Sequence, residues 1–309
     1  MKKSTLADLS LLAVTFVWGT TFVLVQNAVN ILPPHTFNAI RFFMASVFLF
    51  LLIISFYREQ FHKVSGKMLL SGIILGIWLY CGYAFQTIGL LYTTSSKAGF
   101  ITGLSVVMVP LFALLLLKQR PKWPAVVGVS AAAVGLYLLT LSDSLTINRG
   151  DFLVLLCAVS FALQIIFTGK YAPNYPSMAL SLIQISTVSV LSAISALMME
   201  DWHKAFDHHT LLQPAVIWAL LITAIPATAL AFLAQTICQK FTTPTHVALI
   251  FSMEPVFAAF ASFFWTNEVL GFRAFSGCIL IFIGMILSEL QPEQLFLSLR
   301  NKKISSTNR

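Results

Sequence analysis

Charged residues are scarce in this sequence, since Asp, Glu, Lys and Arg together make up only 10% of its 309 residues. Soluble domains contain about 25% charged residues, so the shortage argues against a soluble domain, a disordered chain and a coiled coil. Cysteine is scarce too, and its four residues lie inside apolar stretches: Cys81, Cys157, Cys238 and Cys278. Their wide spacing excludes a secreted disulfide scaffold and a cysteine-based zinc site.

The sequence also lacks the short motifs that mark common enzymes. It contains no His-Glu-x-x-His for zinc, no Gly-x-Ser-x-Gly for a serine nucleophile and no pair of carboxylates in facing apolar segments. It has no Gly-x-x-x-x-Gly-Lys-Ser/Thr loop for nucleotide phosphates, so direct use of ATP is not expected. We therefore expect a protein that is not an enzyme and that uses no cofactor and no metal ion.

Apolar residues dominate instead, at 58% of the chain, with 27 Phe. A helix needs about 20 mostly apolar residues to cross a bilayer, because each residue rises about 1.5 Å and the hydrocarbon core is about 30 Å thick. The runs of this length cover roughly residues 7–27, 36–57, 68–90, 96–117, 123–141, 151–170, 178–199, 213–236, 244–266 and 270–289. Continuous apolar runs exclude a β-barrel. The sequence thus predicts an all-α membrane protein with ten transmembrane helices.

Lysine and arginine are distributed unevenly between the loops of such a protein. With the N-terminus in the cytoplasm, 14 of the 19 basic residues fall on the cytoplasmic side and 4 outside, while Arg41 lies within the second span. Cytoplasmic loops of membrane proteins carry an excess of basic residues, so we expect both termini in the cytoplasm and the protein in the cytoplasmic membrane. This orientation, with a basic cytoplasmic tail at 293–309, explains the net charge of +8, and no nucleic acid partner is expected.

The second half of the sequence weakly repeats the first, at two offsets in residue number. At the first offset, 143, the pairs are Trp18/Phe161, Pro33/Pro176 and Arg41/Gln184. At the second offset, 149, the pairs are Gln86-Thr87-Ile88/Gln235-Thr236-Ile237, Gly128/Gly277 and Gly135/Gly284. We assign residues 1–145 to a first repeat and 146–292 to a second. Because each repeat holds five spans, the second must enter the membrane from the opposite side, an inverted arrangement that recurs in transporters.

Several short motifs occur in order between residues 8 and 290. They are Trp18-Gly19-Thr20, Arg41-Phe42, Gln86 with Gly89-Leu90 and Thr93-Thr94, Met253-Glu254-Pro255-Val256, and Asn267-Glu268. In order and spacing they resemble the EamA-type transporters of the drug/metabolite transporter superfamily. The resemblance implies export of a metabolite or drug, through a cavity lined by spans one, three, four, six, eight and nine. One departure is Gln119, which replaces the acid that Glu268 supplies in the second half.

Glu254 lies near the middle of the ninth span, directly before Pro255. A carboxyl group at this depth is costly unless it is paired or hydrated, and the missing N–H of Pro255 leaves a backbone carbonyl unpaired nearby. We expect Glu254 to line the site of transport and to be able to bind a proton. The alternative is a neutral glutamic acid that is hydrogen-bonded to a neighbouring helix.

Three further charged or titratable side chains lie closer to span ends. An ungapped alignment of the repeats pairs His246 with Lys97 and Glu254 with Ser105, whereas a gapped alignment places Val109 opposite Glu254. For Lys97 and His246 we favour contact with headgroups or water at a helix end. Arg41 either borders the cavity or extends outward to the headgroups. Glu254, His246 and Arg41 are the candidates for proton or charge coupling.

Polar and aromatic side chains recur along the spans that the resemblance assigns to the cavity. The candidate substrate-binding residues are Trp18, Thr21, Tyr80, Tyr83, Gln86, Ser105, Gln164, Thr228, Gln235 and Glu254. Helix–helix packing is the competing interpretation for each hydroxyl side chain, whereas a large amide that faced lipid would be costly. The paired glycines, Gly128 with Gly277 and Gly135 with Gly284, predict close contact between helices or between the subunits of a dimer.

These features together favour a secondary active transporter that works by alternating access, as a monomer or homodimer. The expected substrate is a small amphipathic metabolite, such as an amino acid or a related zwitterion or cation, or a drug-like compound. Proton coupling is one option for the driving force. The alternatives are an uncoupled facilitator or channel and a membrane sensor.

Overall fold

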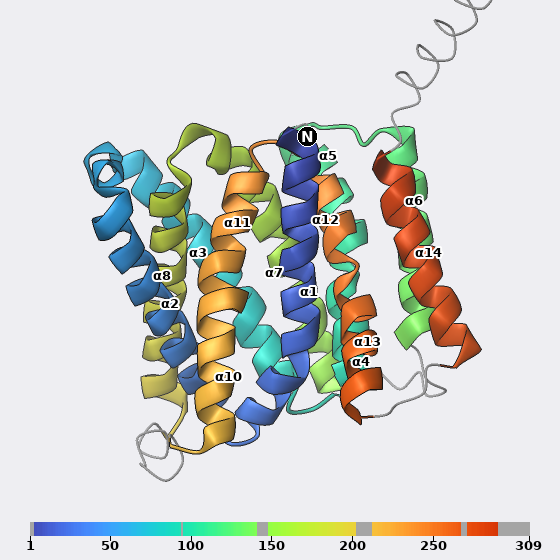
Figure 1. Cartoon of the computed structure of the whole chain (residues 1–309), viewed down its shortest axis with the longest axis horizontal. Helices are drawn as coiled ribbons and strands as arrows, with labels where there is room; N and C mark the ends of the chain where they lie inside the picture. Colours follow the sequence, from blue (N-terminus) through green and yellow to red (C-terminus); the bar gives the residue numbers. More distant parts are fainter. Residues whose placement is uncertain (1–2, 94, 141–147, 202–211, 267–270, 290–309) are drawn as a thin grey trace, which may run out of the picture.

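The computed structural model describes residues 3–93, 95–140, 148–201, 212–266 and 271–289, and these are all-helical, without a strand. The first half contains α1 (Lys3–Val29), α2 (Pro34–Phe56), the 3-10 helix η1 (Arg58–Lys63), α3 (Gly66–Gly89), α4 (Ser95–Gly103), α5 (Ser105–Leu117) and α6 (Trp123–Thr140). The second half contains α7 (Arg149–Tyr171), the 3-10 helix η2 (Ala172–Asn174), α8 (Ser177–Met199), α10 (Pro214–Ala224), the π-helix η4 (Ile225–Leu230), α11 (Ala231–Cys238), α12 (Pro244–Phe251), α13 (Glu254–Thr266) and α14 (Phe272–Glu289). The helices form one bundle (Figure 1).

Seven segments among the described residues are long and apolar enough to cross a membrane. They are Pro34–Phe56, Gly66–Gly89, Lys97–Leu117, Arg149–Asn174, Ser177–Met199, Pro214–Cys238 and Pro244–Ala261. Two shorter apolar helices, Trp123–Leu139 and Phe272–Ser288, accompany them. The prediction of an all-α membrane protein is confirmed at this level.

The order of elements repeats at the two offsets found in the sequence. The first and last residues of α8 are those of α2 shifted by the first offset, 143. The second offset, 149, relates the first residues of three helices to those of three others: α4 to α12, α5 to α13 and α6 to α14. In Figure 1, α2 and α8 lie together at one edge of the bundle, and α6 and α14 lie together at the other. Equivalent helices of the two halves therefore pack against each other.

The contact between α6 and α14 is built on the paired glycines. A Cβ atom added to Gly128 would lie 2.5 Å from the carbonyl oxygen of Gly284, and one added to Gly135 would lie 2.7 Å from that of Gly277. Since the later glycine of α6, Gly135, meets the earlier glycine of α14, Gly277, the two helices run antiparallel. The glycines thus join two helices of one chain, as the packing interpretation predicts, and their surfaces are not left for a dimer.

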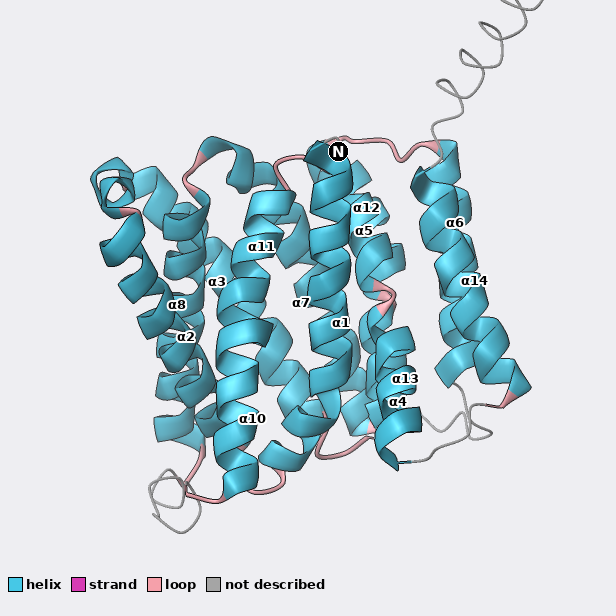
Figure 2. Ribbon diagram, in the orientation of Figure 1, coloured by secondary structure: helices cyan, strands magenta, loops and turns pink. Residues whose placement is uncertain are grey.

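Two spans are interrupted at equivalent places. Leu104 separates α4 from α5, and a turn at Ser252–Met253 separates α12 from α13, where Figure 2 shows a short loop between the two helices. Pro255 is the second residue of α13, a position at which a missing N–H is tolerated. A third irregularity is the π-helical turn η4, which contains Pro226. Such turns are frequent at functional sites.

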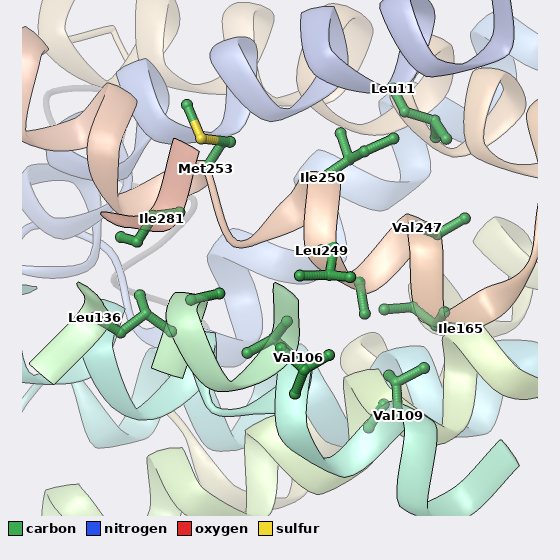
Figure 3. Close-up of a cluster of buried hydrophobic side chains, with 14 of the residues drawn as sticks. Leu11, Val106, Val109, Leu136, Ile165, Val247, Leu249, Ile250, Met253 and Ile281 are labelled. Carbon is green, nitrogen blue, oxygen red and sulfur yellow. The ribbon is translucent and has the colours of Figure 1, made fainter. Parts of the chain in front are cut away.

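The interrupted spans meet in an apolar cluster. Val106 and Val109 of α5 face Leu249 of α12, and Leu136 of α6 and Ile281 of α14 lie at one side of them (Figure 3). All five side chains are fully buried. Close packing of this kind stabilises helix contacts in lipid, where water exclusion contributes little. A second cluster, centred on Phe42, Leu79, Tyr83, Ile185 and Phe232, joins α2, α3, α8 and α11.

Candidate functional site

Trp18 of α1 connects four elements near the middle of the bundle. Its indole Nε1 donates a hydrogen bond of 2.7 Å to the carbonyl oxygen of Ala227 in η4. Its ring packs against Phe232 of α11 and Phe251 of α12, with ring centroids 5.4 and 4.9 Å apart. The side chain is only half-buried. A large aromatic face thus lies beside the irregular turn η4.

Arg41 lies inside the bundle and not among headgroups, because its side chain is only 3% exposed. Its Nε donates a hydrogen bond of 2.7 Å to Thr228 Oγ1, and its Nη2 lies 3.4 Å from the hydroxyl of Tyr83. The guanidinium carbon lies 4.8 Å from the centre of the Tyr83 ring. Thr228 in turn donates to the carbonyl of Thr223, five positions earlier, beside the π-helical stretch. Of the two alternatives for Arg41, the structure therefore favours the interior one.

Tyr83 interacts with Arg41 and with Glu254. Its ring packs edge-on against Phe42, Phe161 and Phe232, with centroid distances of 5.0, 5.3 and 6.2 Å. Glu254 interacts electrostatically with Tyr83. Arg41 therefore contacts Tyr83, and the charge of Glu254 acts on it from another helix.

Glu254 is the first residue of α13, directly after the interruption of its span. Its side chain is half-buried, and it also interacts electrostatically with Cys157 of α7. Cys157 Sγ lies 3.9 Å from Thr102 Oγ1, which accepts a long hydrogen bond of 3.5 Å from Gln86 Nε2. Gln86 of α3 is therefore connected through Thr102 of α4 to Cys157 of α7.

Gly19 allows α1 to reach this interruption. A Cβ atom at Gly19 would lie 2.6 Å from the carbonyl oxygen of Glu254, closer than real Cβ contacts. Ser105 is the equivalent of Glu254, since it begins α5 after the other interruption. This placement favours the ungapped pairing of Glu254 with Ser105 over the gapped pairing with Val109.

Gln164 and Gln235 form a second polar cluster, between α7, α8 and α11. Gln235 Nε2 donates to Gln164 Oε1 at 3.0 Å. Gln164 Nε2 donates to Thr168 Oγ1 at 3.0 Å and lies 3.4 Å from Gln184 Oε1. Gln235 Oε1 and Gln184 Nε2 are buried and have no hydrogen-bond partner among the described residues. The cluster can therefore accept one further polar group.

Two of the predicted substrate-binding residues are engaged elsewhere. The hydroxyl of Tyr80 shares a hydrogen bond of 2.5 Å with Ser195 of α8, and its ring stacks on His35 at 6.4 Å. The hydroxyl of Thr21 donates to carbonyl oxygens of its own helix, at Val17 and Trp18. Neither hydroxyl contacts Arg41 or Glu254.

Two carboxylates that the sequence analysis did not single out pair with His246 and Lys97. His246 Nε2 lies 3.2 Å from Asp8 Oδ1, and Lys97 Nζ lies 3.8 Å from Asp151 Oδ2. The first repeat offset relates Asp8 to Asp151, and the second relates Lys97 to His246, so the two pairs are equivalent. Recurrence of the acid at the first offset is the signal that could have found them. These side chains thus join helices near the starts of α4 and α12, and their contact with headgroups or water at a helix end stays a prediction.

Some predictions fall on parts of the chain that the structure does not describe. Asn267, Glu268 and the basic tail 293–309 lie outside the described residues. Within the described ranges, no group of three His, Cys, Asp or Glu side chains could hold a metal ion.

Comparison with known proteins agrees with the helical repeat. Residues 5–141 and 148–290 both match the model of the EamA-like transporter family. The chain is 35% identical over 285 residues to an uncharacterized transporter of Archaeoglobus fulgidus, covering 92% of this chain and 86% of that protein. It is 21% identical over 287 residues to the uncharacterized transporter YoaV of Bacillus subtilis, covering 91% and 95%. A solved crystal structure with 17% identity superposes with a TM-score of 0.77 over 94% of this chain and 99% of its own, which establishes likeness of fold.

Proposed function

The chain belongs to the EamA-like transporter family, and from this premise we propose that it is a secondary active transporter that exports a small amphipathic metabolite by alternating access. It is a multi-pass membrane protein, and its named relatives are transporters.

We propose ten transmembrane helices in two inverted repeats, 1–145 and 146–292, with both termini in the cytoplasm. The recurrence of helix bounds at the two repeat offsets supports two equivalent halves. The antiparallel contact of α6 with its equivalent α14 supports the inversion, because helices that keep the same direction in both halves would run parallel. The uneven distribution of 14 against 4 basic residues supports the orientation.

The proposed substrate site lies where the interrupted helices meet α1, α3 and η4. Interrupted spans at equivalent positions of two repeats are typical of transporter binding sites, since unwound backbone is tolerated in a membrane where it borders a cavity. This location is supported by the contacts of Trp18 with η4, of Tyr83 and Thr228 with Arg41, and of Glu254 with Gly19. The observation that carries the proposal is the start of α13 at Glu254, in the middle of a span and against Gly19 of α1.

The two equivalent ion pairs support alternating access. In Figure 1, the starts of α1 and α12, which carry Asp8 and His246, lie at one end of the bundle, and α4, which carries Lys97, lies at the other. In the proposed topology the first pair closes the cytoplasmic end and the second closes the outer end. A cycle in which one pair breaks while the other holds would expose the site to one side at a time.

The proposed substrate is an amino acid or a related zwitterion or cation. Aromatic rings surround Tyr83, and aromatic faces attract cations. Glu254 can hold an ammonium group, and we propose that the same carboxyl group binds the coupling proton. Proton and substrate would then compete for binding to Glu254, and this competition would couple their transport across the membrane.

Counterflow in liposomes that contain the purified protein tests this proposal. Liposomes loaded with unlabelled amino acids should take up the labelled amino acid and lose it faster when an inward proton gradient is applied. Glu254→Gln should abolish the dependence on the proton gradient, while Glu59→Gln, an exposed carboxylate on η1, should not. Wild-type exchange that is equal with and without the gradient would remove proton coupling.

A further inference from the structure

Arg41 carries a positive charge that no carboxylate of the described residues balances. The side chain is 3% exposed, and no acidic group of the described residues lies within 4 Å of its nitrogen atoms. Its contacts are the hydroxyls of Thr228 and Tyr83 and the rings of Tyr83 and Phe42. These groups are neutral, so they stabilise the guanidinium only in part.

Burial of an ion without a counter-ion is costly inside a membrane protein, and such residues face an aqueous path or a bound ligand. Arg41 is the eighth residue of α2, about 10 Å below the first at 1.5 Å per residue. Its Nε contact with η4 directs the guanidinium further inward, because Thr228 lies in the middle of its own span. The charge is therefore held inside the bundle, where a ligand within the bundle could neutralise it.

The guanidinium keeps hydrogen-bond donors that such a ligand could use. Arginine has five N–H donors in a planar fork, and the structure uses one on Nε and one on Nη2. The remaining donors match the two oxygens of a carboxylate, which a guanidinium binds through two parallel hydrogen bonds. Thr228 and Tyr83 hold the fork in place from two sides.

The repeat shows that this cation has no counterpart. The residue equivalent to Arg41 is Gln184, which is neutral and lies in the glutamine cluster with Gln164. A single cationic position in the repeat pair fits a ligand with a single acidic group. Glu254 begins another helix, α13, and forms no ion pair with a described residue.

We propose that Arg41 of α2 binds the carboxylate of the transported molecule, while Glu254 of α13 binds its ammonium group. This inference rests on the proposed function and specifies its substrate as a zwitterion held at both poles. It also assigns Arg41 to substrate recognition, whereas the sequence analysis considered it for charge coupling.

Matched sets of compounds test the assignment. Each set contains an amino acid, its amide, the amine without the carboxylate and the acid without the amine, built on phenylalanine and on leucine. In each set, thermal shift of the full-length protein should show binding of the amino acid and of the acid without the amine. The amide and the amine should bind at least about tenfold more weakly. Arg41→Gln should weaken binding of the two compounds that carry a carboxylate about as much as loss of the carboxylate does. Glu254→Gln should weaken binding only of the compounds that carry an amine. Arg58→Gln, which removes an exposed arginine of η1, should change nothing.

Counterflow separates failure of this inference from failure of the proposed function. If the amides and amines are exchanged as well as the acids, and equally by Arg41→Gln, transport stands and the carboxylate site is overturned. If no compound of either set is exchanged, the proposed substrate class fails and the inference fails with it.

A measurement without any ligand provides a second test. Arg41→Met keeps much of the length of the side chain but removes its unbalanced charge, so the ligand-free protein should melt at the same or a higher temperature than the wild type. If Arg41 served only packing, Arg41→Met would lower the melting temperature. A fall of the melting temperature in Arg41→Met, with binding of the acids intact, would overturn the proposal.

Discussion

His246 Nε2 lies 3.2 Å from Asp8 Oδ1, and the two residues occupy the positions that the repeat assigns to Lys97 and Asp151. The first pair joins α12 to α1, and the second joins α4 to α7. Both connect the first part of an interrupted span to the first helix of a repeat. The same electrostatic contact therefore recurs at the two ends of the bundle, with the basic residue changed.

Removing the basic residue of one ion pair should increase local opening only at the end of the bundle where that pair lies. In His246→Gln, amide hydrogen exchange should increase at the starts of α1 and α12, and in Lys97→Gln at the starts of α4 and α7. The increase should be several-fold, because partly buried ion pairs close to helix ends oppose local opening. Each variant is the matched control for the other. Equal changes at both ends in either variant would mean that the pairs are not separate closures.

Gly19 should resist enlargement because α1 touches the interruption between α12 and α13. The Cβ of Gly19→Ala would lie 2.6 Å from the carbonyl oxygen of Glu254, and overpacking of this kind costs about 1–3 kcal/mol. We expect a lower melting temperature and slower counterflow. Gly99→Ala in α4 is the control, since nothing lies within 4 Å of its added Cβ, and it should be neutral or stabilise by about 0.5–1 kcal/mol. Equal melting temperatures for the two variants would argue against the close contact.

Gly128 and Gly135 should be required for the contact of α6 with α14. A Cβ at either position would press on a carbonyl oxygen of α14, so each alanine variant should lower the melting temperature, again by about 1–3 kcal/mol. Gly66→Ala at the start of α3 has open space around its Cβ and serves as the control. The measurement is thermal unfolding together with the mass of the protein in detergent. A change of mass without a loss of stability would place these glycines between two chains.

The sequence predicted individual polar residues better than their partners. Tyr80, Tyr83 and Gln86 recur every three residues, but each step of three turns a helix by about 300°, so Tyr80 and Gln86 point about 120° apart. Tyr80 consequently faces Ser195 of α8, while Tyr83 reaches Arg41. Short spacing on one helix does not decide which neighbour a side chain meets.

The sequence by itself determined the helical class, the repeat and the close-packed glycines. Lipid offers no hydrogen bonds to the backbone, so long apolar runs must form helices, and helices in close contact need small residues where they meet. Only the tertiary structure decided which charges are balanced. Arg41 meets Thr228, and Asp8 meets His246, although each pair joins residues from opposite halves of the chain. Contacts between such distant residues depend on the rotation and crossing of packed helices, which no local pattern of residues specifies.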